Sequence, residues 1–419
     1  MVDKEKIFAL YAEHVNGKRV AGWRRVGLDI LEHRREGCYV WDVDGRRYID
    51  CYNSAGVFNV GRANPVIRQA LIDAAATDDI GDFLLVSEAK ALLAARLSEI
   101  TPGDLNCLMY SVGGGEANDY AIKLARGVTG KPDIIAMERA YHGHTGFSLA
   151  AIGRERYQAP FLPMVPGFKR VPLNDLDALA RAMGGDDTAA VMLEPIQGEG
   201  GIHRAAAEFL RGARELCDRH GALLIFDEVQ TGWGRTGRMF CSEHYGVVPD
   251  IMTVGKSMSG GYYPIAATVF NARLNEFNLR HPYIHLSTFG GSDIGCRVAL
   301  AVIDYIEKHE LCARAESMGN LLLGRLRSVS AQHPRILREV RGMGLMIGLQ
   351  FADDTHGPIM SQMLARRGLI AIYSGNETSV MRLMPALIAD REVINQIADA
   401  IADAADELAR QAPGKPAQK

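Results

Sequence analysis

Short apolar runs alternate with stretches of helical periodicity along most of the chain. The runs NCLMYS, PDIIAM, TAAVMLEP, GALLIFDE and PDIMTVG are each followed by Gly-rich or polar residues. Runs of this kind are typical of strands that are covered on both faces. The stretches EANDYAIKLARGV and AEFLRGARELCDRHG have helical periodicity, and the second ends in a glycine suited to a helix C-cap. The alternation predicts an α/β fold with a mainly parallel sheet.

The pattern differs near both ends of the chain. The segment CYVWDVDGRRYIDCYN alternates around an Asp-Gly pair and predicts a hairpin. After about Cys312 a helix, two strands around RGMGLMIGLQF, a helix-strand-strand passage and a last helix (390–410) indicate a smaller α+β domain. We expect residues 1–60 to contribute to this small domain, residues 61–312 to form a large domain and residues 313–419 to form the rest of the small domain. The tail from about Gln411, QAPGKPAQK, is expected to be disordered.

Composition narrows the class of protein. The 419 residues carry a formal net charge of −3, with Lys and Arg spread along the chain, so neither nucleic acid nor a membrane surface is an expected partner. No apolar run approaches the roughly 20 residues that cross a bilayer. Seven scattered cysteines without CxxC spacing fit reduced thiols in the cytoplasm, and no metal site is predicted.

Two strand ends carry reactive groups. Lys256 follows an apolar strand and a glycine, at the sheet edge where α/β proteins bind ligands, and burial there would make its amine nucleophilic. Asp227 and Glu228 follow a wholly apolar strand, where a carboxylate is unfavourable unless it is paired. The required partner is either a protonated pyridine nitrogen or an arginine such as Arg235.

Three further strand ends offer groups for an anion or a flat ring. In SVGGGEAND, residues 111–119, the glycines let backbone amides approach a phosphate, although such a turn is more often only a tight connection. In AYHGHTG, Tyr141 beside His142 offers a flat face for a planar ligand or a core-packing ring. In HLSTFGGSD, Ser287 and Thr288 are either donors to a phosphate or a helix N-cap.

Together these segments resemble the class III (ω-amino acid) aminotransferases of PLP fold type I, in the branch of the acetylornithine, ornithine and GABA aminotransferases. The matching motifs are EAN, YHG, LEPIQGEGG, LLIFDEVQTGWGRTG, GK before GG-YPIAA, STFGG, RGMGLMIG and RLMPALI. They cover nearly the whole chain, and the DEVQTG-to-GK pair is highly specific. The resemblance implies an aspartate aminotransferase-like large domain and the cofactor pyridoxal 5'-phosphate.

The resemblance also implies a role for each matching position. Lys256 corresponds to the lysine that forms a Schiff base with the cofactor, and Asp227 to the partner of its pyridine nitrogen. The remaining implied contacts are Gly114 and Gly115 with the phosphate, Tyr141 (beside His142) and Val229 with the two ring faces, Gln230 with the ring hydroxyl, and Thr288 with the phosphate of a neighbouring subunit. A homodimer with two composite sites is therefore expected.

Two positions depart from the family pattern. The turn usually reads SG-S/T-EAN, with a hydroxyl that binds the phosphate, but this chain has Gly115 there. The YHG motif is commonly followed by Arg, and here His144 follows it. The first departure predicts weaker retention of the cofactor, and the second leaves substrate contacts near this turn open.

The resemblance implies transamination in two half-reactions, with a small-molecule amine and a 2-oxo acid as substrates. Glu199 and Arg382 match a pair that, in this branch, governs binding of the α-carboxylate of glutamate, so 2-oxoglutarate is an expected co-substrate. The pair could equally be a structural ion pair. A racemase or epimerase on the same fold is the alternative function, and a non-catalytic binding protein is a third hypothesis.

Overall fold

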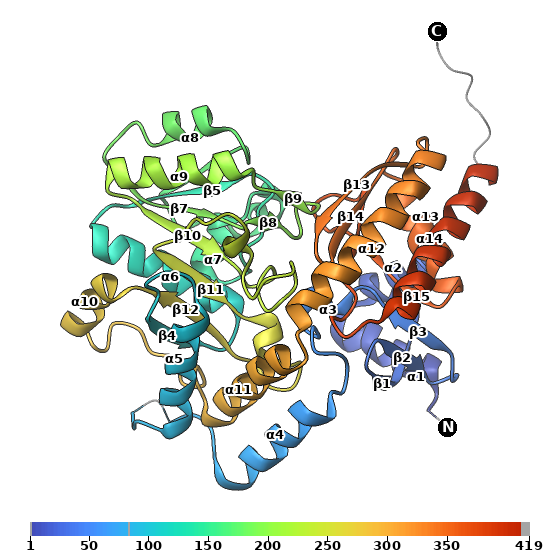
Figure 1. Ribbon diagram of the computed structural model, residues 1–419, viewed down its shortest axis with the longest axis horizontal. Helices are drawn as coiled ribbons and strands as arrows, with labels where there is room; N and C mark the ends of the chain where they lie inside the picture. The colour runs from blue at the N-terminus through green and yellow to red at the C-terminus, as the bar shows by residue number, and fades with distance from the viewer. Residues whose placement is uncertain (1, 83, 412–419) are drawn as a thin grey trace.

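Seven strands form the largest sheet, in the order β4-β12-β11-β10-β7-β5-β6 (Figure 1). The computed structural model describes residues 2–82 and 84–411. The strands are β4 Cys107–Ser111, β5 Asp133–Met137, β6 Phe168–Val171, β7 Thr188–Leu193, β10 Leu223–Asp227, β11 Ile251–Val254 and β12 Ala266–Phe270. Only β12 runs antiparallel to its neighbours, which confirms the expected mainly parallel sheet. All five apolar runs are strands; the pattern did not single out β6 and β12.

Helices cover both faces of this sheet, which explains why its strands are apolar at successive positions. Phe226 of β10 packs with Phe209 of α9 (Ala207–His220) in one core. Ile225, the preceding residue, packs with Leu124 of α6 (Gly114–Thr129) in another core on the opposite face. Successive side chains of a strand point to opposite faces, so a strand between two helical layers must be apolar throughout.

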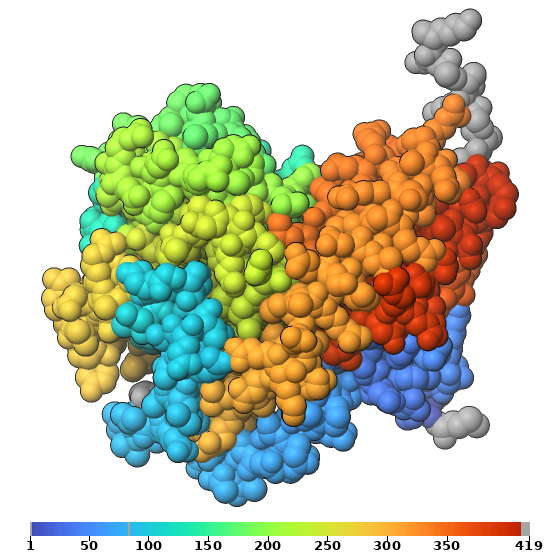
Figure 2. Space-filling view, in the orientation of Figure 1, coloured from blue at the N-terminus to red at the C-terminus, as the bar shows by residue number. Residues whose placement is uncertain are grey.

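The second lobe is built from both ends of the chain, drawn in blue and in orange to red in Figure 2. One sheet contains β1 (Glu32–Glu36), β2 (Tyr39–Asp42), β3 (Arg47–Asp50) and β15 (Leu369–Ile370), and β15 pairs in parallel with β3. The other contains β13 (Leu337–Met343), β14 (Met346–Phe351), β17 (Val380–Leu383) and β16 (Ile372–Tyr373). The predicted 38–53 hairpin is present as β2 and β3.

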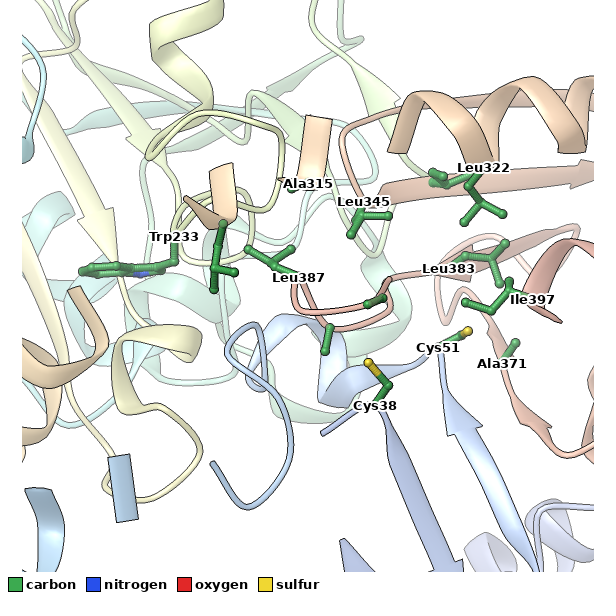
Figure 3. Packing of buried hydrophobic residues seen from close by; sticks show 14 of the residues in the cluster. Cys38, Cys51, Trp233, Ala315, Leu322, Leu345, Ala371, Leu383, Leu387 and Ile397 are labelled. Carbon is green, nitrogen blue, oxygen red and sulfur yellow. The ribbon is translucent and has the colours of Figure 1, made fainter. Parts of the chain in front are cut away.

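One hydrophobic core ties these segments together. Figure 3 shows Cys38 and Cys51 from the N-terminal segment beside Leu383 and Ile397 from the C-terminal segment, with Trp233 in the same cluster. The cluster joins the N-terminal and C-terminal segments through buried apolar contacts. The division of the chain at residues 61 and 312 stays a prediction.

The remaining elements complete the layers. The helices are α1 Lys4–Tyr11, α2 Gly17–Arg25, α3 Asn53–Gly56, α4 Pro65–Thr77, α5 Glu88–Ile100, α7 Gly146–Ala151, α8 Leu176–Ala182, α10 Ala272–Arg280, α11 Asp293–Lys308, α12 Leu311–Gln332, α13 His356–Arg366 and α14 Arg391–Gln411, with short helical turns η1 Ala12–Asn16, η2 Glu155–Tyr157, η3 Ala159–Phe161, η4 Cys241–His244 and η5 Lys256–Ser259. The pair β8 (Ile196–Gln197) and β9 (His203–Arg204) forms a separate ribbon. The expected disordered tail beyond Gln411 lies outside the described residues. Within residues 2–82 and 84–411, no helix is long and apolar enough to cross a membrane.

Candidate active site

The carboxyl ends of several strands of the large sheet meet at one cavity of about 200 Å³. Strands β4, β5, β7, β10 and β11 all run in the same direction, so the residues that follow them gather at one edge of the sheet. The cavity is lined by Gly114, Gly115, Asn118, Tyr141, His142, Glu194, Glu199, Asp227, Val229, Gln230 and Lys256. Most of the residues singled out from the sequence therefore lie around one space.

Asp227, the last residue of β10, is buried in a network of donors. Its Oδ2 atom accepts a hydrogen bond from Asn118 Nδ2 at 2.8 Å and lies 2.8 Å from His142 Nδ1. Its Oδ1 atom accepts bonds from the Val229 amide at 3.0 Å and from Thr253 Oγ1 at 3.4 Å. Burial disfavours the charged imidazole of His142, but the hydrogen bond and charge of Asp227 outweigh it and raise the pKa of His142.

Arg235 does not pair with the acidic residues at the end of β10, so this alternative for their partner is wrong. The Arg235 guanidinium binds the carbonyl oxygens of Leu345 at 2.9 Å and Pro385 at 2.6 Å. Glu228 instead accepts bonds from the backbone amides of Cys241 at 2.8 Å and Ser242 at 2.7 Å. Burial raises the pKa of Glu228. Glu228 therefore belongs to the packed interior, and Asp227 alone of the two lines the cavity.

Lys256 reaches the same cavity from the end of the neighbouring strand β11. Parallel pairing places Asp227 opposite Thr253, three residues before Lys256. Burial lowers the pKa of the Lys256 amine, against the opposing charges of Asp227 and Glu199. The backbone of Lys256 has a φ of 45°, a left-handed conformation that is strained for a residue with a side chain and is enriched at functional sites.

The glycine-rich turn forms the wall opposite β10. Gly114 is the first residue of α6, and a Cβ atom there would lie 2.7 Å from Cγ1 of Val229. Glycine is therefore required for the helix N-terminus to approach the residues after β10 this closely. Gln230 is buried, and its side-chain oxygen has no hydrogen-bond partner within the described part of the chain.

Glu199 and Arg382 form an ion pair at the rim of the cavity. Arg382 Nη1 donates to Glu199 Oε1, and the Arg382 side chain is 4% exposed. The pair joins the turn between β8 and β9 to strand β17. Ser374 Oγ also donates to the backbone oxygen of Glu199, so the segment 372–383 of the second lobe packs directly against this turn.

Thr288 is the one predicted cofactor residue that the structure does not bring to this cavity. It is exposed, in the segment between α10 and α11, and does not line the cavity. The segment HLSTFGGSD does provide a helix N-cap, but the capping residue is Ser292, at the start of α11, and not Ser287 or Thr288. Ser287 Oγ instead accepts a bond from the Gly290 amide.

Three buried residues of the site escaped the sequence-based prediction. Asn118 lies within α6, and Thr253 Oγ1 donates to its Oδ1 atom at 2.7 Å. Glu194 follows β7 and accepts bonds from the amides of Tyr141 and Gly198, both at 2.9 Å. The strand-end rule that selected Asp227 would also have selected Glu194. Asn118 and Thr253 gave no such signal, because they lie inside a helix and a strand.

The buried Glu194 carboxyl predicts a pH-dependent stability. Burial raises the pKa of Glu194 from 4.5 to about 7. A carboxyl with a higher pKa in the folded chain stabilises the fold fully below pH 4.5, and this stabilisation is lost as the pH rises towards 7. The loss is on the order of 3 kcal/mol. Denaturant unfolding across this pH interval should therefore show a smaller fall in the free energy of unfolding for Glu194→Gln than for wild type.

The control for this comparison is Glu208→Gln, at an exposed position on α9. It should keep the pH dependence of the wild-type chain. If Glu194→Gln falls in stability as steeply as wild type and Glu208→Gln, Glu194 is not the group responsible.

Comparison with known proteins places the chain in a family. The family model described as aminotransferase class-III matches residues 23–405. An uncharacterised aminotransferase of Archaeoglobus fulgidus is 42% identical over 97% of this chain and 95% of its own length. The ornithine aminotransferase of Toxoplasma gondii, in a structure described as showing partial occupancy of PLP at its active site, is 28% identical with a TM-score of 0.86 and coverage of 91% of each chain. The acetylornithine aminotransferase of Elizabethkingia anophelis is 29% identical with a TM-score of 0.84, covering 97% of this chain and all of that one (100%).

These findings bear on the hypotheses drawn from the sequence. The expected PLP fold type I architecture is confirmed, and the hypothesis of a non-catalytic binding protein is excluded. None of the relatives described above is a racemase or epimerase, so the alternative function gains no support. The chain belongs to the class III aminotransferases and is a transaminase.

Proposed function

We propose that this transaminase uses pyridoxal 5'-phosphate, held through Lys256, to move an amino group from an amine, of the ω-amino or non-α-amino type, to a 2-oxo acid such as 2-oxoglutarate. The observation that carries the proposal is the convergence of Lys256 and Asp227 on one cavity from the ends of adjacent strands. A reactive amine and a buried carboxylate are the two groups that this chemistry requires of the protein.

The residues around the cavity fit such a cofactor. Asp227 already accepts bonds from protein donors and can hold a protonated ring nitrogen close by. Gln230 Oε1 and His142 Nε2 are buried side-chain atoms without partners in the described residues, which suits a site that holds a polar ligand. Gly114 and Gly115 open α6, whose first amides and helix dipole favour a phosphate.

We assign the catalytic and positioning roles to four residues of the chain. The cofactor, when bound, supplies an electron sink that stabilises negative charge on the substrate carbon. Lys256 Nζ, with its pKa lowered by burial, would take the proton from that carbon and deliver it to the cofactor, not back to the same carbon, so that the amino group can be transferred. Tyr141 and Val229 line the cavity and are assigned to the two faces of the ring. His142, bonded to Asp227, keeps that carboxylate oriented.

The co-substrate proposal rests on the Glu199–Arg382 pair. Arg382 is buried behind Glu199, which lines the cavity, and its Nε atom has no partner in the described residues. An arginine guanidinium binds carboxylates in a bidentate manner, so Arg382 can bind the α-carboxylate of glutamate when it leaves Glu199. An ω-amine substrate leaves the Glu199–Arg382 pair closed.

The proposed enzyme is a homodimer in which Thr288 contributes to the cofactor phosphate site of the other subunit. In this chain, Thr288 is exposed and does not line its own cavity. Large apolar side chains are also exposed beside it and on the nearby segment 84–86, namely Leu84, Leu85, Val86, Tyr283, Leu286 and Phe289. Exposed apolar surface of this kind is typical of an interface between subunits.

All seven cysteines are free thiols, which supports the expected cytoplasmic location.

Chemical mapping of the cofactor tests the proposal. Borohydride reduction followed by peptide mass analysis should find the reduced cofactor on Lys256 in wild type and in the control Lys18→Ala, a substitution at an exposed lysine. Lys256→Ala should lack the adduct and lose at least about a thousandfold in transamination rate, because both the anchoring amine and the base are removed. An adduct on another lysine, or wild-type turnover in Lys256→Ala, would contradict the proposal.

Single-turnover kinetics test the role of Arg382. With glutamate as donor, Arg382→Ala should react about 100-fold more slowly than wild type, since a charge-assisted bond to the carboxylate is lost. With an ω-amine that lacks this carboxylate, the same variant should change much less. Arg382→Lys, which keeps the charge, should recover part of the glutamate rate. Full glutamate rates in Arg382→Ala would show that the pair is only structural.

A further inference from the structure

The glycine-rich turn at the start of α6 has no side-chain hydroxyl. Class III relatives commonly have Ser or Thr at the position of Gly115, and this chain has only glycines from 113 to 115. Helix α6 also has no side-chain hydrogen bond at its N-cap, Gly113. If the cavity holds a phosphate, as the proposed function requires, the hydroxyl must come from another part of the chain or be missing.

Thr145 fills the space that a side chain at position 115 would need. A Cβ atom on Gly115 would lie 3.0 Å from Thr145 Oγ1 and 3.5 Å from Thr145 Cγ2. The loop that carries Thr145 also approaches the start of α6 at a second point, since a Cβ atom on Gly143 would lie 2.7 Å from the Cα atom of Gly115. The hydroxyl of Thr145 thus lies next to the position that a side chain on residue 115 would occupy.

The loop that carries Thr145 is fixed to α6 by hydrogen bonds. Ser148 Oγ, three residues further on, donates to the backbone oxygen of Gly115 at 2.7 Å. The Ser148 amide also donates to Asp119 Oδ1 at 2.7 Å. These bonds hold Thr145 in register with the first turn of α6, so the approach of Thr145 to Gly115 is part of the folded structure.

The Thr145 hydroxyl is available for a ligand. Thr145 is the N-cap residue of α7, yet its side chain makes no capping bond. No hydrogen bond to Thr145 Oγ1 occurs within residues 2–82 and 84–411. Thr145 is exposed and does not itself line the cavity, but Gly115, which it approaches, does. The cavity contains unpartnered polar atoms in residues that are more than nine-tenths buried, namely His142 Nε2 and Gln230 Oε1. These atoms independently indicate a polar ligand at this place.

We propose that Thr145 donates a hydrogen bond to the cofactor phosphate and replaces the hydroxyl that the turn lacks at Gly115. The inference rests on the proposed function, since it needs a phosphate at the start of α6. It adds a side-chain donor from the same subunit to the backbone amides of Gly114 and Gly115 and to Thr288 of the neighbouring subunit. A hydrogen bond from a hydroxyl to a charged phosphate stabilises binding of the cofactor more than a hydrogen bond between two neutral groups would.

Equilibrium titration of the cofactor-free protein with pyridoxal 5'-phosphate tests the proposal. Thr145→Ala should raise the dissociation constant about tenfold or more, the loss expected for one bond to a charged group. Thr145→Ser keeps the hydroxyl and should stay within about threefold of wild type. The double variant Gly115→Ser with Thr145→Ala moves the hydroxyl back to the helix and should recover most of the lost affinity.

Titration with pyridoxal, which has no phosphate, separates phosphate binding from a general structural effect. Thr145→Ala should bind pyridoxal with nearly the wild-type dissociation constant. Equal losses for both ligands, or wild-type affinity of Thr145→Ala for the phosphorylated cofactor, would overturn the role of Thr145. Failure of the double variant to recover affinity, with Thr145→Ser also impaired, would do the same. Wild-type protein that takes up no cofactor would instead overturn the proposed function, and this inference with it.

Discussion

The structure of the site depends on one constraint, the burial of the Asp227 carboxylate at the end of an apolar strand. A charge in such a place is unfavourable unless donors surround it. The donors come from three different elements: Asn118 from α6, His142 from the loop after β5, and Thr253 from β11. Satisfying one carboxylate therefore fixes the helix, the loop and the neighbouring strand relative to β10, and the cavity lies where they meet.

The same constraint links the cofactor proposal to the proposed reaction. Asp227 can stabilise a positive charge about 4 Å away by about 4 kcal/mol at an effective dielectric constant near 20. Lys256 lies on the adjacent strand end, where burial lowers the pKa of its amine and favours the neutral form that reacts. The buried carboxyl of Glu194 accepts hydrogen bonds from the Tyr141 and Gly198 amides, and it thereby joins the loop of Tyr141 to the turn that carries Glu199. The Glu199–Arg382 pair then connects this arrangement to the smaller lobe.

Much of this arrangement could be predicted from the sequence, because its signals are local. Each buried parallel strand is a short apolar run; Asp227 is the last residue of one of them, and Lys256 lies just beyond the end of another. The motifs around them also indicated the family. Arg235 shows the limit of local reasoning, since its partners are carbonyl oxygens more than 100 positions away. Asn118 and Thr253 lie inside a helix and a strand, so their spacing in the sequence gave no sign of a role in the site. Thr145 was not predicted either, because its proposed role depends on its approach to Gly115 in the folded chain. The antiparallel strand β12 and strand β6 were missed among less distinctive apolar segments.

The half-reaction rate of Asp227→Asn, measured in a single turnover with the cofactor bound, tests the central claim most directly. The substitution keeps the shape of the side chain but removes the charge, and the loss of about 4 kcal/mol corresponds to a rate about a thousandfold lower. Glu228→Gln is the matched control, because it makes the same change from carboxyl to amide at the adjacent buried residue, which does not line the cavity. The account predicts a near-normal rate for Glu228→Gln and the thousandfold loss for Asp227→Asn. A rate for Asp227→Asn within about tenfold of wild type would contradict it.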